Sequence, residues 1–279
     1  MNRALNDNHD LHPILKVENL VKQYSRRNLA SKREGVLALA GISFAIMPRT
    51  TVAVIGESGS GKSTLGLCVA SLESPTSGRI WFEGKDVGEL SQNERRQLRS
   101  QIQLIFQDPA NSLNPRWNSL ELLIEPLVLQ RKINRDEMKR HAHSLLEQVG
   151  LPPEILERSP MEMSGGQRQR LAIARALALD PKLVILDEAL SALDCSVQAQ
   201  IANLLMELQI NLGISYLFIT HDLAMAAHLA SEILVLDRGM LVEQGTTEKI
   251  LRQPHDETTR RLLQSTPRMI RPAHPVWER

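Results

Sequence analysis

The amino-acid sequence predicts an α/β fold whose central, mostly parallel sheet is interrupted by a mainly helical subdomain. Strand-like runs alternate with helical patterns in both halves of the chain, and a loop with helical patterns fills the stretch from Gln107 to about Gln169 between them. A glycine-rich loop, GESGSGKST at 56–64, joins a strand-like run to a helix. The 279 residues are enough for one large α/β domain, or for one domain with an inserted subdomain.

Strand-like runs dominate the first part of the chain. These apolar stretches predict strands at 14–20, 36–47, 50–56, 77–84 and 102–107. The polar, basic stretch 25–35 between the first two strands is predicted to be a solvated loop. A helical pattern at 63–72 directly follows the glycine-rich loop.

The segment that follows Gln107 has a different character. It begins with a loop, DPANSLNPR at 108–116. Helical patterns then follow at 119–130, 135–149 and 153–158. We therefore place the inserted helical subdomain at about 108–170.

Alternating strands and helices resume at Lys182. Strands are predicted at 182–189, 215–222 and 232–239, with helices near 196–212 and 222–230. In the longer of these helices, apolar residues recur every three to four positions, which predicts one buried face. These residues are Val197, Ile201, Leu204, Leu205, Leu208 and Leu212.

The composition excludes several classes of function. A formal net charge of +1 argues against a general electrostatic attraction to nucleic acid or anionic lipid. Aromatic residues are only 3% of the chain, so stacking platforms for single-stranded nucleic acid are not expected. Two cysteines, Cys68 and Cys195, cannot by themselves form a disulfide framework or a four-ligand metal site, and a reducing cytosol is the expected compartment.

The sequence predicts neither a secretory signal nor a membrane span. The stretch 1–13 lacks the apolar region of a secretory signal, and no run of about 18 apolar residues occurs. We therefore expect any membrane role to come through a partner.

The loop at 56–64 has the residues and the context of a phosphate-binding loop. Its glycines let the backbone curl so that successive N–H groups point at phosphate oxygens. Lys62 is placed to reach the β- and γ-phosphates of a nucleotide, and the hydroxyl of Ser63 to ligate Mg²⁺. A plain glycine-rich turn is the alternative, which the preceding strand and the following helix disfavour.

Two carboxylates end the predicted strand LVILDEA at 183–189. Four apolar residues precede Asp187 and Glu188, as in a buried strand that delivers side chains at its C-terminal end, where open α/β sheets bind ligands. We expect Asp187 to hold Mg²⁺, directly or through water, and Glu188 to polarise an attacking water. An Asp-Glu pair at a strand end is usually only solvated, but the phosphate-binding loop in the same chain favours the catalytic interpretation.

With further motifs, these features resemble the nucleotide-binding subunit of an ABC transporter. MSGGQ at 163–167 is similar to the signature of that family, and SALD at 191–194 to its D-loop. Gln107 resembles the Q-loop glutamine, and His221 in ITHD resembles the switch histidine. Tyr24 stands where the family stacks an aromatic ring on adenine.

This resemblance implies a fold and a set of site residues. It implies an ABC-type P-loop NTPase domain at 14–253, with a mostly parallel core sheet, an N-terminal antiparallel β region and the inserted helical subdomain. The residues implied to contact ATP are Tyr24, Gly56, Glu57, Ser58, Gly59, Ser60, Gly61, Lys62, Ser63, Thr64, Ser164, Gly165, Gly166 and Gln167. The residues implied to act in hydrolysis are Lys62, Gln107, Glu188 and His221, and those implied to hold Mg²⁺ are Ser63, Gln107 and Asp187.

The resemblance also gives the signature segment a role in a second subunit. SGGQ opens a predicted helix whose N-terminus has a partial positive charge and unpaired N–H groups. In the family this helix end caps the γ-phosphate of the ATP held by the facing subunit. Two chains, identical or paralogous, are therefore expected to enclose two nucleotides in a head-to-tail dimer.

The neighbourhood of Gln107, IFQDPANSLNPR, resembles that of the ATPases of dipeptide, oligopeptide and nickel importers, as does TTRRLLQSTP in the C-terminal tail at 254–279. This implies integral-membrane permease subunits, an extracytoplasmic substrate-binding protein and no nucleic-acid partner, at the cytoplasmic face of the bacterial inner membrane. Three features depart from the family pattern. Ala189 stands where Pro is frequent, Met163 replaces the usual Leu, and the tail lacks the usual His-Pro-Tyr-Thr sequence. No cysteine cluster follows His221, so no iron–sulfur centre is expected.

Several alternatives stay open at this point. The substrate is a dipeptide, a longer peptide, nickel or a metal chelate, and the ATPase of an exporter or of a lipoprotein-release system is a second interpretation. A soluble ABC protein acting on DNA or ribosomes usually carries a coiled coil or two tandem cassettes, neither of which the sequence shows. An inactive cassette conflicts with the intact Lys62, Asp187, Glu188 and His221.

Overall fold

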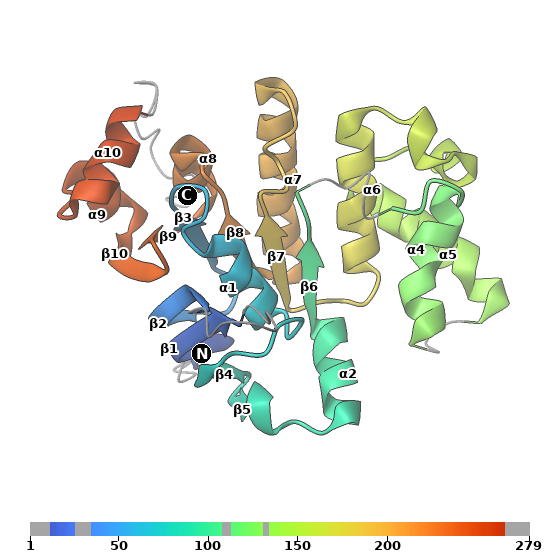
Figure 1. Cartoon of the computed structure of the whole chain (residues 1–279). Coiled ribbons are helices and arrows are strands. Elements are labelled where there is room, and N and C mark those ends of the chain that lie inside the picture. The colour runs from blue at the N-terminus through green and yellow to red at the C-terminus, as the bar shows by residue number, and fades with distance from the viewer. Residues whose placement is uncertain (1–11, 26–34, 108–112, 131–133, 266–279) are drawn as a thin grey trace, which may run out of the picture.

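The structure, a computed structural model, describes residues 12–25, 35–107, 113–130 and 134–265. These residues form two sheets with helices around them (Figure 1). One sheet has the strand order β2-β1-β4-β5, and the other has the order β10-β9-β3-β8-β7-β6. The predicted loop at 25–35 and the first residues of the DPANSLNPR loop lie largely outside the described residues.

The first sheet is antiparallel and comes from the N-terminal part of the chain. Its strands are β1 (Leu15–Tyr24), β2 (Val36–Ile46), β4 (Ser77–Phe82) and β5 (Lys85–Asp86). Strand β1 pairs with both β2 and β4 in antiparallel register. The antiparallel β region expected at the N-terminus is confirmed.

The second sheet is the parallel core of the molecule. Its strands are β3 (Thr51–Ile55), β6 (Ile102–Ile105), β7 (Leu183–Asp187), β8 (Ser215–Ile219), β9 (Glu232–Asp237) and β10 (Met240–Thr246). All neighbours pair in parallel except β10, which runs antiparallel to β9 at one edge. Every residue of β3, β7 and β8 is buried, as expected for parallel strands covered on both faces.

Two hydrophobic clusters cover the opposite faces of this core sheet. Along β3, Ala53 and Ile55 belong to the cluster shared with the helices of the second half of the chain. The alternate residues Val52 and Val54 belong to the cluster shared with the antiparallel sheet. The core sheet is therefore the middle layer of the molecule.

The helices have the following bounds. The α-helices are α1 (Lys62–Val69), α2 (Gln92–Gln101), α4 (Ser119–Leu129), α5 (Arg135–Gln148), α6 (Gly165–Leu177), α7 (Cys195–Leu212), α8 (Leu223–Leu229), α9 (Thr247–Arg252) and α10 (Glu257–Ser265). Short 3₁₀ helices span Val87–Glu89, Pro153–Glu157 and Pro160–Glu162.

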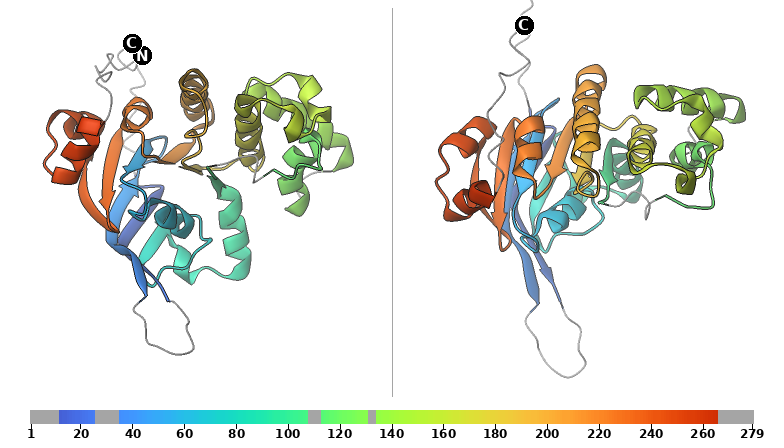
Figure 2. Two further views of the ribbon diagram at one scale, coloured as in Figure 1. Left: turned by 45° about the horizontal axis from the view of Figure 1, so that its top comes forward. Right: turned by 90° about the horizontal axis from the view of Figure 1, so that it is seen from above.

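Helices α4, α5 and α6 pack on one another and lie together beyond the β6 edge of the core sheet (Figures 1 and 2). Helix α6 also contacts β6 and α7, and it extends to Leu177. Helices α9 and α10 follow β10 at the opposite edge of the sheet (Figure 1). The three-helix group and the core sheet thus face each other across a seam.

Two local differences from the sequence prediction concern the type of one helix and the length of another. The pattern at 153–158 forms a 3₁₀ helix over Pro153–Glu157, and Arg158, which follows it, is in an extended conformation. The helix expected at 63–72 ends at Val69, and Ser71 has a positive φ of 55° that is incompatible with a continuing α-helix.

Helix α2 was not predicted. It buries only Leu98 and Ser100, so its sequence lacks the apolar periodicity that marks the other helices. Its start carries another signal, a capping box in which Ser91 and Glu94 satisfy each other's backbone N–H groups.

Among the described residues, no helix combines the length and the apolar character that crossing a membrane requires.

Candidate functional site

The predicted phosphate-binding loop connects β3 to α1 and depends on glycine for its shape. A Cβ at Gly56 would lie 2.2 Å from the backbone oxygen of Leu236, and one at Gly61 would lie 2.5 Å from that of Ala38. Gly61 is the N-cap of α1, with φ 102° and no side-chain cap. The N–H groups of the first helical turn therefore have no side-chain acceptor at this position and can bind an anion.

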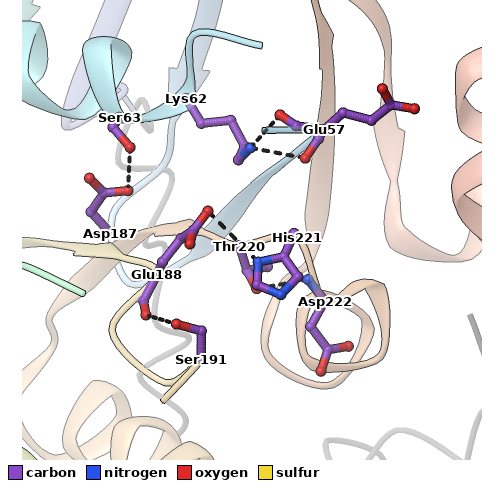
Figure 3. A network of polar contacts seen from close by, with 10 residues as sticks. Glu57, Lys62, Ser63, Asp187, Glu188, Ser191, Thr220, His221 and Asp222 are labelled. Atoms are coloured by element: carbon purple, nitrogen blue, oxygen red, sulfur yellow. Dashed lines mark hydrogen bonds and ion pairs between the residues drawn. The ribbon is translucent and has the colours of Figure 1, made fainter. Parts of the chain in front are cut away.

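Lys62 is folded over this loop. Its Nζ donates to the backbone oxygens of Gly56 at 2.9 Å and Glu57 at 2.8 Å (Figure 3). The residue is only 4% exposed, and burial lowers the pKa of Lys62, although Glu188 and Asp187 nearby oppose the shift. Among the described residues no carboxylate forms an ion pair with Lys62, so its buried charge favours an incoming anion.

Ser63 and Asp187 meet at the C-terminal end of β7. The Ser63 hydroxyl donates to Oδ1 of Asp187 at 3.0 Å (Figure 3). Asp187 is buried, and this burial raises the pKa of its carboxyl. A buried carboxylate next to a hydroxyl fits Mg²⁺, because the cation would compensate the desolvated negative charge. The described residues contain no group of three or more His, Cys, Asp or Glu side chains that could hold a metal ion.

Glu188 has an unusual backbone conformation. Its φ is 49°, in the left-handed region that a side chain with a Cβ rarely adopts. Its N–H donates to the oxygen of Ile219 at 2.9 Å, and its own carbonyl accepts from the Ser191 hydroxyl at 2.9 Å and from the Ser191 N–H at 3.1 Å. These three bonds hold the turn at the end of β7 in a fixed shape.

His221 lies opposite the side chain of Glu188. Its Nδ1 is 3.7 Å from Oε1 of Glu188, which is too far for a hydrogen bond (Figure 3). The His221 side chain is 60% exposed and that of Glu188 is 21% exposed. Both side chains are thus accessible from the space above the ends of β7 and β8.

Gln107 lies in the seam between the core sheet and the three-helix group. It is exposed just after the end of β6 and lines a groove of about 880 Å³ that also reaches Asp187. Glu125 on α4 and Arg175 on α6 also line this groove, and they form an ion pair of 2.6 Å. The groove thus connects Asp187 at the end of β7 with α4 and α6 of the helical group.

The signature residues start α6. Ser164 and Gln167 form a capping box, in which the Ser164 hydroxyl accepts from the Gln167 N–H at 3.3 Å and Oε1 of Gln167 accepts from the Ser164 N–H at 3.0 Å. A Cβ at Gly165 would lie 3.4 Å from Leu193, and one at Gly166 would lie 2.9 Å from Val197. The signature therefore packs on the segment that leads into α7.

The structure brings together only part of the predicted site. The phosphate-binding loop, Asp187, Glu188 and His221 lie close together (Figure 3), whereas α6 lies apart from α1 in both views of Figure 2. Among the described residues, no hydrogen bond or ion pair joins Ser164–Gln167 to the loop at 56–64. The signature thus lies apart from the phosphate-binding loop of its own chain.

Tyr24 ends β1 and is half-buried. The ammonium of Lys22 lies 4.8 Å from the centroid of its ring. This contact was not predicted from the sequence, although two positions along a strand place the side chains on one face. The bond from Ser191 to Glu188 was also missed, because a serine near a carboxylate is not a signal on its own.

Two of the three departures noted in the sequence are accommodated by packing. Met163 and Ala189 are buried in the cluster shared with the helices. Cys68 is also buried, and this burial raises the pKa of its thiol to about 11, as expected for a small apolar residue. Cys195 is exposed at the first position of α7.

Comparison with known proteins places these features in context. The family model described as ABC transporter matches residues 39–191. The chain is 45% identical to the dipeptide transport ATP-binding protein DppF of Haemophilus influenzae over 258 residues, 92% of this chain and 79% of that protein. It is 43% identical to the protein of the same name from Escherichia coli, covering 92% of this chain and 77% of the relative.

Two solved structures are similar in fold. One is an ATP-binding cassette solved as a dimer in a post-hydrolysis state with ADP and Pi bound, with a TM-score of 0.74 and 29% identity over 84% of this chain and 98% of the other. The second is cbiO1 of Clostridium perfringens, part of the ABC transporter complex cbiONQ, with a TM-score of 0.75 and 30% identity over 86% of this chain and 91% of the other.

Proposed function

This chain belongs to the ABC transporter family and is an ATPase of that family, and from this premise we propose that it powers the import of peptides through a membrane-embedded permease. The observation that carries the peptide assignment is the 45% identity to a dipeptide transport ATP-binding protein over 92% of the chain. The relatives include several further peptide import ATP-binding proteins, which supports import of a peptide over export or nickel uptake.

The geometry supports a specific division of roles around ATP. The N–H groups of the loop at 56–64 and the charge of Lys62 bind the phosphates, and the Tyr24 ring stacks on adenine. Ser63, Asp187 and Gln107 are the residues that would hold Mg²⁺. The cation, when bound, neutralises charge on the β- and γ-phosphates.

Glu188 is the residue placed to activate water. Its carboxylate accepts a proton from the water that attacks the γ-phosphorus, while the bond between this phosphorus and the oxygen of the leaving ADP breaks. The backbone contacts with Ile219 and Ser191 hold the side chain in position before the reaction. His221, beside the Glu188 carboxylate, is positioned to donate to a γ-phosphate oxygen.

The signature segment serves a second subunit in this proposal. Its separation from its own chain's phosphate-binding loop supports a head-to-tail dimer in which Ser164, Gly165, Gly166 and Gln167 contact the nucleotide of the facing chain. The similar cassette that was solved as a dimer supports this arrangement. The facing chain is either a second copy or a paralogue.

The groove beside Gln107 is the proposed docking site for the permease. It is lined by Phe106, Pro126 and Leu129, of which Phe106 is 44% and Leu129 is 64% exposed, and it leads from this surface to Asp187. A permease segment in the groove would sense closure of the ATP site through Gln107. The chain would then act at the cytoplasmic face of the inner membrane, with a substrate-binding protein on the other side.

Uptake of a labelled dipeptide tests the proposed function. A strain that lacks this chain should lose uptake, and wild-type protein but not the Glu188→Gln variant should restore it. If dipeptide uptake persists in the deletion strain while uptake of nickel or release of an exported cargo fails, the peptide assignment is wrong.

A further inference from the structure

We propose that Lys22 is a positioning residue for the base of ATP: it holds the Tyr24 ring in place and covers the ring face opposite to the one on which adenine stacks. This inference rests on the proposed role of Tyr24 as the adenine platform. It assigns a function to a lysine outside the phosphate-binding loop and the other motifs.

Lys22 is held by three groups at once. Its ammonium lies 4.8 Å from the centroid of the Tyr24 ring, within the range of about 6 Å for a cation–π interaction. The same Nζ donates to Oε2 of Glu73 at 2.6 Å and to the carbonyl of Ser74 at 2.8 Å. The ammonium has three N–H donors, so two hydrogen bonds and one ring contact satisfy it.

Burial and charge distinguish Lys22 from an ordinary surface lysine. Its side chain is 12% exposed, whereas that of Lys16 on the same strand is 52% exposed. The hydrogen bond to Glu73, together with the negative charge of this carboxylate, raises the pKa of Lys22 despite its burial. The side chain therefore remains a cation over the ring at neutral pH.

These contacts tie the base site to the phosphate site. Lys22 and Tyr24 are on β1, whereas Glu73 and Ser74 follow α1, the helix that starts at Lys62. Two further bonds join the same segments, from Thr76 N–H to the oxygen of Val21 and from Gln23 N–H to Oγ1 of Thr76. The ring is thus fixed relative to the loop that binds the phosphates.

The position of the ammonium has two consequences for a nucleotide. The cation occupies one face of the ring, which leaves the opposite face for a base. The positive charge of Lys22 also reduces the negative electrostatic potential of the tyrosine ring. The ring of adenine therefore stacks on the opposite face with less repulsion. A ring that is held before ATP arrives loses less conformational entropy on binding.

A double-mutant cycle tests the inference. Lys22→Met keeps the length of the side chain but removes its charge, and should weaken MgATP binding about two- to tenfold, the fold-change that corresponds to a single cation–π contact. KM for ATP should rise by the same factor, with kcat at saturating ATP unchanged. In a Tyr24→Ala background, Lys22→Met should have no further effect, because the ring through which it acts is absent.

Two controls separate this role from a general loss of structure. Inorganic tripolyphosphate with Mg²⁺, measured by competition, has no base, so its affinity should be equal for the wild type and Lys22→Met. Lys16→Met removes a lysine from the same strand that is paired with Glu18 at 2.6 Å, and MgATP affinity should not change.

The contrary results are distinct from one another. If Lys22→Met weakens MgATP binding equally in the presence and absence of the Tyr24 ring, or if tripolyphosphate affinity falls in parallel, Lys22 does not act through the ring and the inference is wrong. If Tyr24→Ala alone leaves MgATP affinity unchanged, Tyr24 is not the adenine platform, and the proposed base site fails together with the inference.

Discussion

At the scale of single residues, the two adjacent carboxylates at the end of β7 differ in burial and in backbone conformation. Asp187 is buried against the Ser63 hydroxyl, and burial raises the pKa of its carboxyl. Glu188 has a partly exposed side chain but a backbone fixed in the left-handed region. The first carboxylate is suited to a cation and the second to a water molecule.

Glu188→Gln should bind MgATP normally and hydrolyse it very slowly. The amide keeps the shape of the side chain but cannot accept the proton of the attacking water, a loss of about 10²–10⁴-fold in turnover. Binding of a fluorescent ATP analogue and release of phosphate check the two parts. Turnover near that of the wild type would remove Glu188 from the catalytic role.

Asp187→Asn should stabilise the nucleotide-free protein and abolish the Mg²⁺-dependent part of ATP binding. Because the folded-state pKa of Asp187 is raised, the folded protein holds the proton more tightly than the unfolded chain, and the ionised carboxylate costs stability at neutral pH. Asn retains an acceptor for the Ser63 hydroxyl without this charge.

The stabilisation by Asp187→Asn should depend on pH, because it comes from removing a carboxyl whose pKa is raised in the folded protein. The gain in Tm should be largest above the raised pKa of Asp187 and should shrink as the pH falls toward 3.8, the ordinary value for Asp. Thermal unfolding with and without ATP and Mg²⁺ measures both parts. A lower Tm for the nucleotide-free variant at neutral pH would contradict the account of Asp187.

At the scale of elements, the seam between β6 and the helices α4 and α6 is the feature that connects the site with the surface. The Glu125–Arg175 pair joins the two helices within the groove, with side chains 27% and 29% exposed. Apolar residues that are exposed at its rim favour a partner over solvent.

Leu129→Asp should impair association with the permease and leave MgATP binding by the isolated chain unchanged. Leu129 is 64% exposed, so the fold tolerates a charge there, but an apolar contact at an interface would be lost. We expect at least about tenfold weaker binding to permease in detergent or nanodiscs. Ile210→Asp is the matched control, since Ile210 is 81% exposed on α7 and does not line the groove. Equal effects of the two changes would argue against docking in the groove.

The elements also differ in how well the sequence alone predicts them. Buried strands such as β7 and amphipathic helices such as α7 were predictable because apolar spacing reports burial directly. Helix α2 was missed because its stability comes from a capping box and little apolar burial. The site motifs were recognisable in sequence, but the placement of Lys22 also depends on its bonds to Glu73 and Ser74. The turn at Glu188 likewise depends on the bond from its N–H to Ile219, and such contacts between separate segments leave no signal in the sequence.

At the scale of the whole molecule, two helices start with glycine-rich segments suited to anions, and they do not face one site. Helix α1 begins at the loop beside Asp187 and Glu188, whereas α6 begins at the signature on the side of the helical group (Figure 1). In the proposed head-to-tail dimer, one chain would therefore contribute residues to two composite sites. The facing chain would supply the other residues of each site.

The MgATP affinity of the isolated Gly165→Asp chain tests this central claim most directly. The fold tolerates the change, because a Cβ at Gly165 would be 3.4 Å from Leu193 and an acidic side chain is favourable in the first turn of a helix. In the dimer, however, the carboxylate would repel the γ-phosphate of the facing chain and block close approach of the backbone. We predict that the monomeric variant binds MgATP like the wild type, while the turnover of the assembled dimer falls by about 10²–10³-fold. If the monomer instead loses MgATP binding as severely as Lys62→Ala does, the signature serves the nucleotide of its own chain and the composite site is contradicted.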